Sequence, residues 1–297
     1  MEVVENVAIF DLLKMIRPPN AFMVTAMAVT GIWFASDNTE WWLYVLAIIV
    51  ANAYIGIAMV HNDIIDLDID KINAPHRALP SGKVSLKQAK IYAIVLFIIG
   101  TIAGLGVGSL EAIIIMSITL ILSLLYNSKL KQLGFLGNIT VGVTATSAFL
   151  YGDAIVSGWD HFWPISTWNA SIYLFLISAI LNTSREVAKG IMDTEGDREY
   201  GIKTIAVLYG KFNAARLVLL LILVAIIVAL LPLFNHTFGP LFILAAGGFV
   251  LLLLRQGIPL LKDPNYNTAK KFKNWLLPNM FIALVIIIID VAISRYF

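Results

Sequence analysis

The sequence predicts an all-α membrane protein, a polytopic bundle of nine transmembrane helices. Hydrophobic residues make up 59% of the 297 residues, charged residues only 13%, and the mean hydropathy is +0.85. A soluble domain carries about 25% charged residues, so this composition excludes an ordinary cytosolic enzyme and a disordered chain. The apolar runs are long and undivided, which argues against the short alternating strands of a membrane barrel. The absence of cysteine excludes disulfides, thiolate metal sites and cysteine nucleophiles.

Nine apolar segments can cross the hydrocarbon core of a bilayer when their flanking residues are included. The sixth is expected to continue into the polar segment after Ser184, and Asp290 of the ninth to reach the membrane interface. In chain order the predicted spans are 21–35, 41–60, 89–107, 110–125, 135–156, 171–184, 214–234, 241–254 and 275–293.

The basic residues fall on one side of this bundle. All but Arg295 of the 21 Lys and Arg lie in cytoplasmic segments if the N-terminus is cytoplasmic. The positive-inside rule therefore places the N-terminus inside and the C-terminus outside. Lys270, Lys271 and Lys273 are expected simply to set this topology and meet anionic lipid. The segment before Arg17 has mixed charge and lacks a small-residue cleavage site, so we expect no secretory signal peptide.

Acidic residues gather where two spans meet the cytoplasmic loops. Eight of the 19 acidic residues lie in segments 61–70 and 192–199. In and just before these segments polar residues recur every fourth position, at a mutual offset of 127 residues: Asn62, Asp66 and Asp70, then Lys189, Asp193 and Asp197. Such residues form one ridge on a helix. Like charges four apart destabilise a helix by about 0.2–0.5 kcal/mol per pair, so the acidic ridges predict bound cations.

The residue types around these ridges predict the ligand. Carboxylate and amide oxygens favour a hard cation, above all Mg²⁺, which also takes phosphate oxygens of a substrate. Cationic side chains accompany the acids, namely Arg77, Lys131, Lys189 and Lys203. Metal and cationic side chains together suit a diphosphate leaving group, whose developing negative charge they neutralise. The apolar bundle indicates that the rest of the substrate is a long hydrocarbon chain.

Two motifs resemble those of the UbiA superfamily of intramembrane prenyltransferases. Residues 62–70, NDIIDLDID, match its NDxxDxxxD motif, and residues 193–197, DTEGD, match its second DxxxD motif. Supporting matches are Arg17-Pro18 with Asn20, segment 77–82, Tyr126-Asn127 with Leu130-Lys131, and Gly137-Asn138. The resemblance covers nearly the whole chain and implies a single domain over 1–297, with pseudo-repeat halves of about 1–134 and 135–297. Within the superfamily, Arg185-Glu186, Lys189, the second motif and Lys203-Thr204 are similar to archaeal digeranylgeranylglyceryl phosphate synthases.

That resemblance implies Mg²⁺-dependent transfer of a geranylgeranyl group from its diphosphate to geranylgeranylglyceryl phosphate in archaeal ether-lipid synthesis. It implies a multi-pass protein of the cell membrane with a cytoplasmic active site. The expected partners are a prenyl diphosphate donor, a lipid-like acceptor and membrane lipid, without nucleic acid. The implied metal ligands are Asn62, Asp63, Asp66, Asp70, Asp193 and Asp197. The implied catalytic residues are Asp66, Asp70, Asp193, Asp197 and Lys189. The implied diphosphate or acceptor contacts are Arg17, Asn20, Arg77, Tyr126, Lys131, Asn138, Glu186 and Lys203.

Other interpretations stay open at this point. Gly190 and Ala78 depart from the residues common in the superfamily, and chlorophyll synthases share a similar second motif. An aromatic quinone precursor is therefore an alternative acceptor for the same ionisation chemistry. Arg17 could be a topological anchor, and Tyr126 and Asn138 could serve helix packing. A cation-coupled transporter is the alternative from another class, although transporter sites usually lie near the bilayer midplane.

Overall fold

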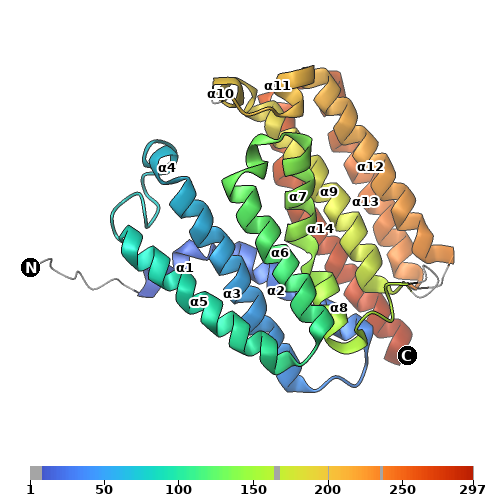
Figure 1. Ribbon diagram of the computed structural model, residues 1–297. Helices are drawn as coiled ribbons and strands as arrows, with labels where there is room; N and C mark the ends of the chain where they lie inside the picture. Colours follow the sequence, from blue (N-terminus) through green and yellow to red (C-terminus); the bar gives the residue numbers. More distant parts are fainter. Residues whose placement is uncertain (1–8, 164–167, 200, 235–236, 297) are drawn as a thin grey trace, which may run out of the picture. The chain divides into compact units, whose positions relative to one another are not determined.

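The computed structural model describes residues 9–163, 168–199, 201–234 and 237–296. Every regular element in this part of the chain is a helix, which confirms the predicted all-α class (Figure 1). The elements are α1 Ile9–Met15, α2 Pro18–Ala35, α3 Trp41–Ile65, α4 Leu67–Asn73, α5 Leu86–Val107, α6 Leu110–Ser128, η1 Leu130–Gln132, α7 Phe135–Thr146, α8 Ala148–Ser157, α9 Ala170–Met192, α10 Thr194–Glu199, α11 Ile205–Tyr209, α12 Lys211–Phe234, α13 Pro240–Lys262 and α14 Tyr266–Tyr296. The part of the N-terminal segment that precedes Ile9 lies outside the described residues.

Each of the nine predicted spans coincides with helical structure. The fifth is broken at Ser147 into α7 and α8, and the sixth continues as expected to Met192 within α9. Within the described part of the chain, six helices are long and apolar enough to cross a membrane: α3, α5, α6, α12, α13 and α14. The α7–α8 pair would be a seventh if it forms one bent span. The count of nine spans and the orientation of the termini stay predictions.

The chain divides into two compact units. Unit 1 comprises the described part of Met1–Ser128 together with Ser147–Trp159, and unit 2 the described part of Lys129–Thr146 and Asp160–Phe297. In unit 1, α3 packs along α5, α2 and α6, and α2 also packs on α8. Glycines allow the close approach of α2 and α8, because a Cβ at Gly31 would collide with Phe149 O and one at Gly152 with Ala28 O.

A small core cluster anchors the loop that follows the first acidic segment. Met15, Val60, Leu79 and Val84 are at most 5% exposed and pack together. Burying their apolar side chains fixes the loop against α1 and α3. Arg77 stands in this loop and is thereby held near the end of α3.

In unit 2, α9 is the central helix and packs against α7, α12 and α14. Ile191 and Val187, at the end of α9, belong to a core cluster that also contains Leu260 of α13 and Phe272 of α14. These residues are at most 2% exposed. Met192 also packs against this cluster, so the apolar packing reaches the residue directly before Asp193.

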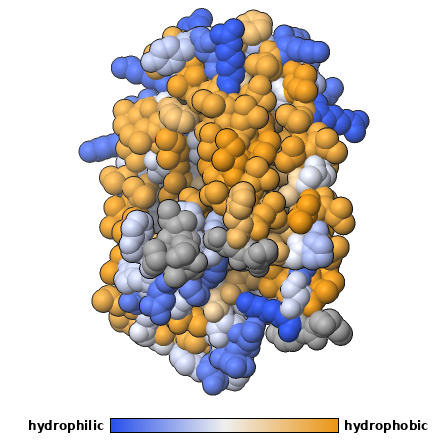
Figure 2. Space-filling model, turned by 90° about the vertical axis from the view of Figure 1, so that its right-hand side faces the viewer, coloured by the Kyte–Doolittle hydropathy of each residue, from blue (hydrophilic) through white to orange (hydrophobic). Residues whose placement is uncertain are grey.

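Large hydrophobic side chains cover much of the helix surface. Ile102 of α5, Ile227 of α12 and Leu244 of α13 are between 61% and 72% exposed. Figure 2 shows a broad hydrophobic area on the visible face, with hydrophilic side chains gathered above it. Such exposed apolar surface suits contact with lipid rather than water.

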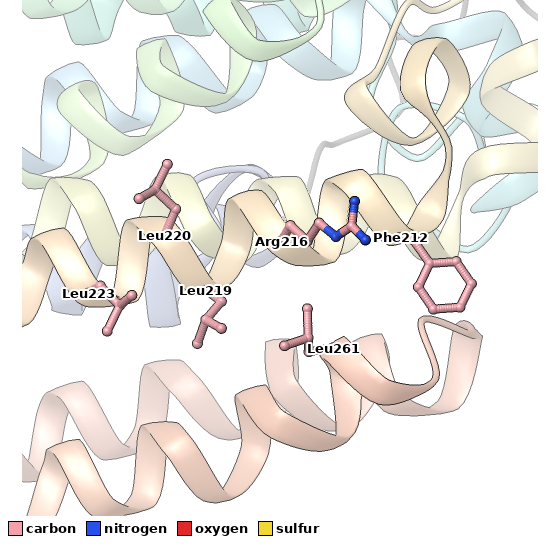
Figure 3. Close-up of a pocket in the computed structure, with 6 residues that line it drawn as sticks. All are labelled: Phe212, Arg216, Leu219, Leu220, Leu223 and Leu261. Atoms are coloured by element: carbon pink, nitrogen blue, oxygen red, sulfur yellow. The ribbon is translucent and has the colours of Figure 1, made fainter.

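A surface groove of about 480 Å³ lies between α12 and α13 in unit 2 (Figure 3). Its lining residues are Phe212, Arg216, Leu219, Leu220, Leu223 and Leu261. Arg216 Nη1 donates to Asn213 Oδ1 at 3.1 Å. All six lining residues differ from the predicted site residues, so this groove is a separate feature of the apolar surface.

Candidate functional site

The first acidic segment, 61–70, spans the end of α3 and the short helix α4. Asp66 caps the C-terminus of α3 with φ −88° and ψ 9°, and its N–H donates to Asn62 O at 2.9 Å. The N–H of Asp70 then donates to Asp66 O at 2.7 Å. The hydrogen bonds between residues four apart therefore continue across the helix break, and the three polar residues form the ridge that their spacing predicts.

Two arginines hold the buried carboxylates of this segment. Arg17 Nη2 donates to Asp63 Oδ1 at 2.8 Å and to Asn62 Oδ1 at 3.0 Å. Arg77 Nη1 donates to Asp70 Oδ2 and lies 3.7 Å from Asp63 Oδ1. Asp63 and Asp70 are only 3% and 7% exposed, and a buried charge is costly unless it is paired. Both carboxylates would have to exchange these arginines for a cation to act as the predicted metal ligands.

Arg17 also has an unusual backbone conformation. Among the described residues it is the one non-glycine residue with a positive φ, 55°, and it caps the N-terminus of α2 directly before Pro18. The left-handed conformation costs an L-residue about 1–2 kcal/mol. Such strain persists where surrounding contacts impose it, and here those contacts are the bonds to Asp63 and Asn62. This favours a role in positioning the acidic segment over a simple topological anchor.

A buried amide on α6 orients Asn62. Asn127 is 9% exposed, and its Nδ2 donates to Ala58 O at 3.0 Å and lies 3.3 Å from His61 Nδ1. The Ala58 carbonyl can only accept, so Asn127 Oδ1 faces Asn62 and accepts from its Nδ2 at 3.4 Å. Asn62 Nδ2 also donates to Asp66 Oδ2 at 3.0 Å. The side-chain oxygen of Asn62 is therefore presented on the opposite side, where a cation or Arg17 can use it.

Asn20 and Tyr126 are the other two predicted contact residues of unit 1. Asn20 is exposed, and its Nδ2 approaches Met59 Sδ at 4.0 Å. Tyr126 is half-buried on α6. The sequence-based prediction selected Tyr126 and missed Asn127, which makes the contact with Asn62. The matched motif already contained the Asn127 side-chain amide next to Tyr126. The sequence does not show, however, that this amide faces Asn62.

The second acidic segment, 192–199, repeats the backbone arrangement of the first. Asp193 caps the C-terminus of α9 with φ −95° and ψ 5°, and its N–H donates to Lys189 O at 3.1 Å. The N–H of Asp197 donates to Asp193 O at 2.8 Å. Thr194, 3% exposed, fixes the break because its hydroxyl donates to Gly190 O at 2.8 Å. The predicted ridge of the second segment is therefore also present.

Asp197 lies among charged side chains of unit 2. Burial raises the pKa of Asp197, and the neighbouring charge of Asp193 raises it further. Lys189, a hydrogen bond from the Thr204 hydroxyl and Lys131 act in the opposite direction by favouring the carboxylate. The structure thus brings the predicted residues Lys131 and Lys189 to the second motif. Thr204 belongs to the matched segment, but the sequence alone indicates no role for it.

Lys203 and Asn138 both contact Gly134 through the backbone. Gly134 has φ 58°, and a Cβ there would collide with Lys203 O. The turn before α7 therefore packs directly on the Lys203 backbone, while the Lys203 side chain is exposed. Asn138 is half-buried in the first turn of α7, and its N–H donates to Gly134 O at 3.2 Å.

Further cationic side chains accompany α9. Glu186 Oε1 accepts from Arg185 Nη1 at 2.8 Å, and the two side chains are 11% and 21% exposed. Lys273 of α14 interacts electrostatically with Arg185, Lys189, Asp193 and Glu186. The prediction had assigned Lys273 only to topology, because nothing in its local sequence indicates that α14 packs beside α9.

The donor atoms fit a magnesium ion that is completed by a substrate. Among the described residues, no group of three or more His, Asp or Glu lies close enough to hold a metal alone. Mg²⁺ in proteins commonly uses one or two carboxylates and fills its other positions with water and phosphate oxygens. Asp66 with Asn62 Oδ1, and Asp193 with Asp197, supply oxygen ligands of that kind. The arrangement can therefore hold metal-bound phosphate rather than a metal ion in an all-protein cage.

Comparison with known proteins agrees with these observations. The model of the UbiA prenyltransferase family matches residues 22–285. The digeranylgeranylglyceryl phosphate synthase of Methanobrevibacter smithii is 32% identical over 278 residues, covering 92% of this chain and 95% of the relative. That of Methanocaldococcus jannaschii is 31% identical over 279 residues, covering 93% and 94%.

Solved structures share the fold. A structure described as giving insights into digeranylgeranylglyceryl phosphate synthase in membranes has a TM-score of 0.80 at 29% identity, covering 95% of this chain and 98% of that one. A UbiA homologue from Archaeoglobus fulgidus, bound to DMAPP and Mg²⁺, has a TM-score of 0.74 at 17% identity and covers 97% and 100%. The resemblance drawn from the two acidic motifs is thereby confirmed, and the chain belongs to the UbiA prenyltransferase family.

Proposed function

We propose that this prenyltransferase moves a geranylgeranyl group from its diphosphate to geranylgeranylglyceryl phosphate, with Mg²⁺ as cofactor. The observation that carries the proposal is the repeated acidic helix end: Asp66 and Asp193 cap α3 and α9 in the same conformation, each with cationic side chains nearby. The similarity to digeranylgeranylglyceryl phosphate synthases supports the choice of acceptor.

The resemblance to the family implies that both acidic motifs serve one prenyl diphosphate in the proposed reaction. When bound, Mg²⁺ would neutralise the diphosphate oxygens as the carbon–oxygen bond of the donor breaks. Asn62 with Asp66 in the first segment, and Asp193 with Asp197 in the second, would each supply oxygen ligands for Mg²⁺, while Asp63 and Asp70 position Arg17 and Arg77. Cationic contacts to the leaving diphosphate would come from Arg77, Lys131, Lys189 and Lys203.

The bond electrons leave with the diphosphate, and an allylic cation remains. The free hydroxyl of the acceptor then forms the new carbon–oxygen bond and releases its proton. The apolar helix faces exclude water, which would otherwise quench the cation.

Transfer of radiolabelled geranylgeranyl groups by the purified protein in detergent tests this function. We expect activity with geranylgeranylglyceryl phosphate, loss of activity without Mg²⁺, and a loss of about 100-fold or more in Asp66→Asn and in Asp193→Asn. Arg216→Gln removes a charge from the groove between α12 and α13 and serves as the control with normal activity. Full activity of either aspartate variant would overturn the mechanism, and transfer only to an aromatic quinone precursor would overturn the acceptor.

We also propose nine spanning helices, with the N-terminus and the active site on the cytoplasmic side and the C-terminus outside. The absence of cysteine makes this directly testable, because single cysteines can be introduced without background. A cysteine at Gly82 should react with an impermeant thiol reagent only from the cytoplasmic side, and one at Ser36 only from the outside. The reverse pattern would invert the topology.

A further inference from the structure

We propose that Arg185 of α9 and Lys273 of α14 bind the phosphate of the prenyl acceptor. The inference rests on the proposed function, since that function supplies an acceptor that carries a phosphomonoester. It adds a binding site whose residues differ from the carboxylates assigned to the donor diphosphate.

Helix packing places Lys273 beside α9. Its neighbour Phe272 is fully buried in the same core cluster as Val187 and Ala188 of α9. The two helices therefore meet at Phe272, and the next residue, Lys273, stands half-buried at the border of this contact. Arg185 lies three residues before Ala188 and therefore on the same face of α9, so both cations belong to the rim of one interface.

The charges at this rim favour an anion. Arg185 and Lys189 influence the Lys273 ammonium more strongly than the carboxylates of Asp193 and Glu186 do. Among the described residues, no hydrogen bond or ion pair joins Lys273 to another side chain. Bringing like charges together in partly buried surroundings is unfavourable, and a bound anion would offset that cost.

Arg185 has an unused donor directed into the protein. Its Nη1 donates to Glu186 Oε1, but its Nε is buried without a hydrogen-bond partner among the described residues. An unsatisfied buried donor costs about 1–3 kcal/mol. A phosphate presents several acceptor oxygens, and the planar guanidinium group binds such oxygens through two nitrogens at once. A phosphomonoester could therefore satisfy Nε and accept from the Lys273 ammonium together.

This chemistry distinguishes the two acceptor classes. An uncharged aromatic ring would leave the Arg185 Nε and the Lys273 ammonium without an acceptor, and Arg185 would keep only its ion pair with Glu186. The phosphate of a glycerol ether would neutralise them and would hold the acceptor by its polar end. Arg185 and Lys273 would thus select the phosphorylated lipid.

Steady-state kinetics with two acceptors test the proposal: geranylgeranylglyceryl phosphate and the same lipid without its phosphate. In Lys273→Gln and in Arg185→Gln we expect the KM for the phosphorylated acceptor to rise about tenfold or more. The KM for the prenyl diphosphate and the activity with the unphosphorylated acceptor should stay within about twofold. Lys273→Arg keeps the charge and should restore most of the lost affinity.

Lys271→Gln provides the matched control, because Lys271 is an exposed lysine on the same helix. Its acceptor KM should equal that of the unaltered protein. If Lys273 had a purely structural role, its substitution would change kcat and the KM values of both substrates alike. A rise in the acceptor KM alone therefore separates phosphate binding from a structural role.

The remaining outcomes each decide a different point. If the unaltered protein uses the phosphorylated acceptor but Lys273→Gln and Arg185→Gln keep its KM, the phosphate site is wrong while the proposed function stands. If the unaltered protein does not use that acceptor at all, the proposed function itself fails. A rise in the KM of the prenyl diphosphate would instead assign the two cations to the donor. Stabilisation by an anionic phospholipid through Lys273, with an unchanged acceptor KM, would assign them to membrane lipid.

Discussion

Asp66 and Asp193 occupy equivalent positions 127 residues apart in the chain. Each caps the end of a long helix in nearly the same backbone conformation, and each is followed at once by a short helix. The fourth residue after each is a second aspartate whose N–H donates back to the first, at 2.7 and 2.8 Å. The same offset relates Arg77, which holds Asp70, to Thr204, which holds Asp197. The repeat thus includes the partner of the second acid, although the chemistry of that partner differs.

We predict that Asp66→Asn and Asp193→Asn are not additive in activity. If both carboxylates act on one metal-bound diphosphate, removing the first already loses most of what the second contributes. The double variant should then be close to the weaker single variant in kcat/KM. If instead the fold-loss in kcat/KM of the double variant equals the product of the two single fold-losses, the segments act independently. Arg216→Gln combined with either variant gives the expected additive control.

A second prediction concerns Asn127. Asn127→Leu removes the amide that orients Asn62, so we expect the Kd for geranylgeranyl diphosphate with Mg²⁺ to rise about threefold to tenfold. Asn52→Leu is the matched control. Asn52 Nδ2 donates to Thr25 Oγ1 at 2.8 Å, a similar bond between helices that lies away from the acidic residues. Both variants should unfold at lower temperature, but only Asn127→Leu should bind more weakly, as equilibrium binding in detergent would show. Equal Kd values would contradict the orienting role.

The strained backbone of Arg17 leads to a third prediction. Arg17→Ala and Arg17→Gly both lose the ion pair with Asp63, but glycine adopts φ 55° without steric cost. Arg17→Gly should therefore be more stable than Arg17→Ala by about 1 kcal/mol. Thermal unfolding of the two variants in the same detergent measures the difference. An alanine variant as stable as the glycine variant would contradict this prediction, because it would show that the backbone relaxes once the bonds to Asp63 and Asn62 are lost.

The helices could be predicted from the sequence because burial in lipid depends on local apolar runs. The continuation of α9 to Met192 followed from the same reasoning, whereas the break at Ser147 carried no comparable signal. The spacing of Asp66 and Asp70 also predicted their ridge, since residues four apart lie on one helix face. These features depend on neighbours in the chain, which a sequence displays directly.

Contacts between distant residues could not be predicted in this way. The sequence places Asp290 near the membrane interface but does not indicate its partners: it is 1% exposed and accepts from Gly239 N at 2.6 Å and Leu241 N at 2.9 Å. It therefore caps the N-terminus of α13, where free backbone N–H groups need acceptors. Asn127 and Lys273 were overlooked for the same reason, because their partners lie on other helices. Only packing decides which polar residues of a helix face one another.

The pKa of Asp197 leads to the last prediction. Burial and the charge of Asp193 raise this pKa, whereas the Thr204 hydroxyl lowers it by donating to the carboxylate. Thr204→Val removes that donor, so the pKa should rise and Mg²⁺-dependent binding of geranylgeranyl diphosphate should fail at a higher pH than in the unaltered protein. Thr204→Ser keeps the donor, and it keeps the cap that Thr204 Oγ1 provides for Val207 N. Binding in this variant should therefore fail at the same low pH as in the unaltered protein. Lys131→Gln leaves that cap intact but removes a positive charge that favours the carboxylate. The pH at which binding fails should therefore rise in this variant as well. If Thr204→Val shifted while Lys131→Gln did not, loss of the cap rather than ionisation of Asp197 would explain the change.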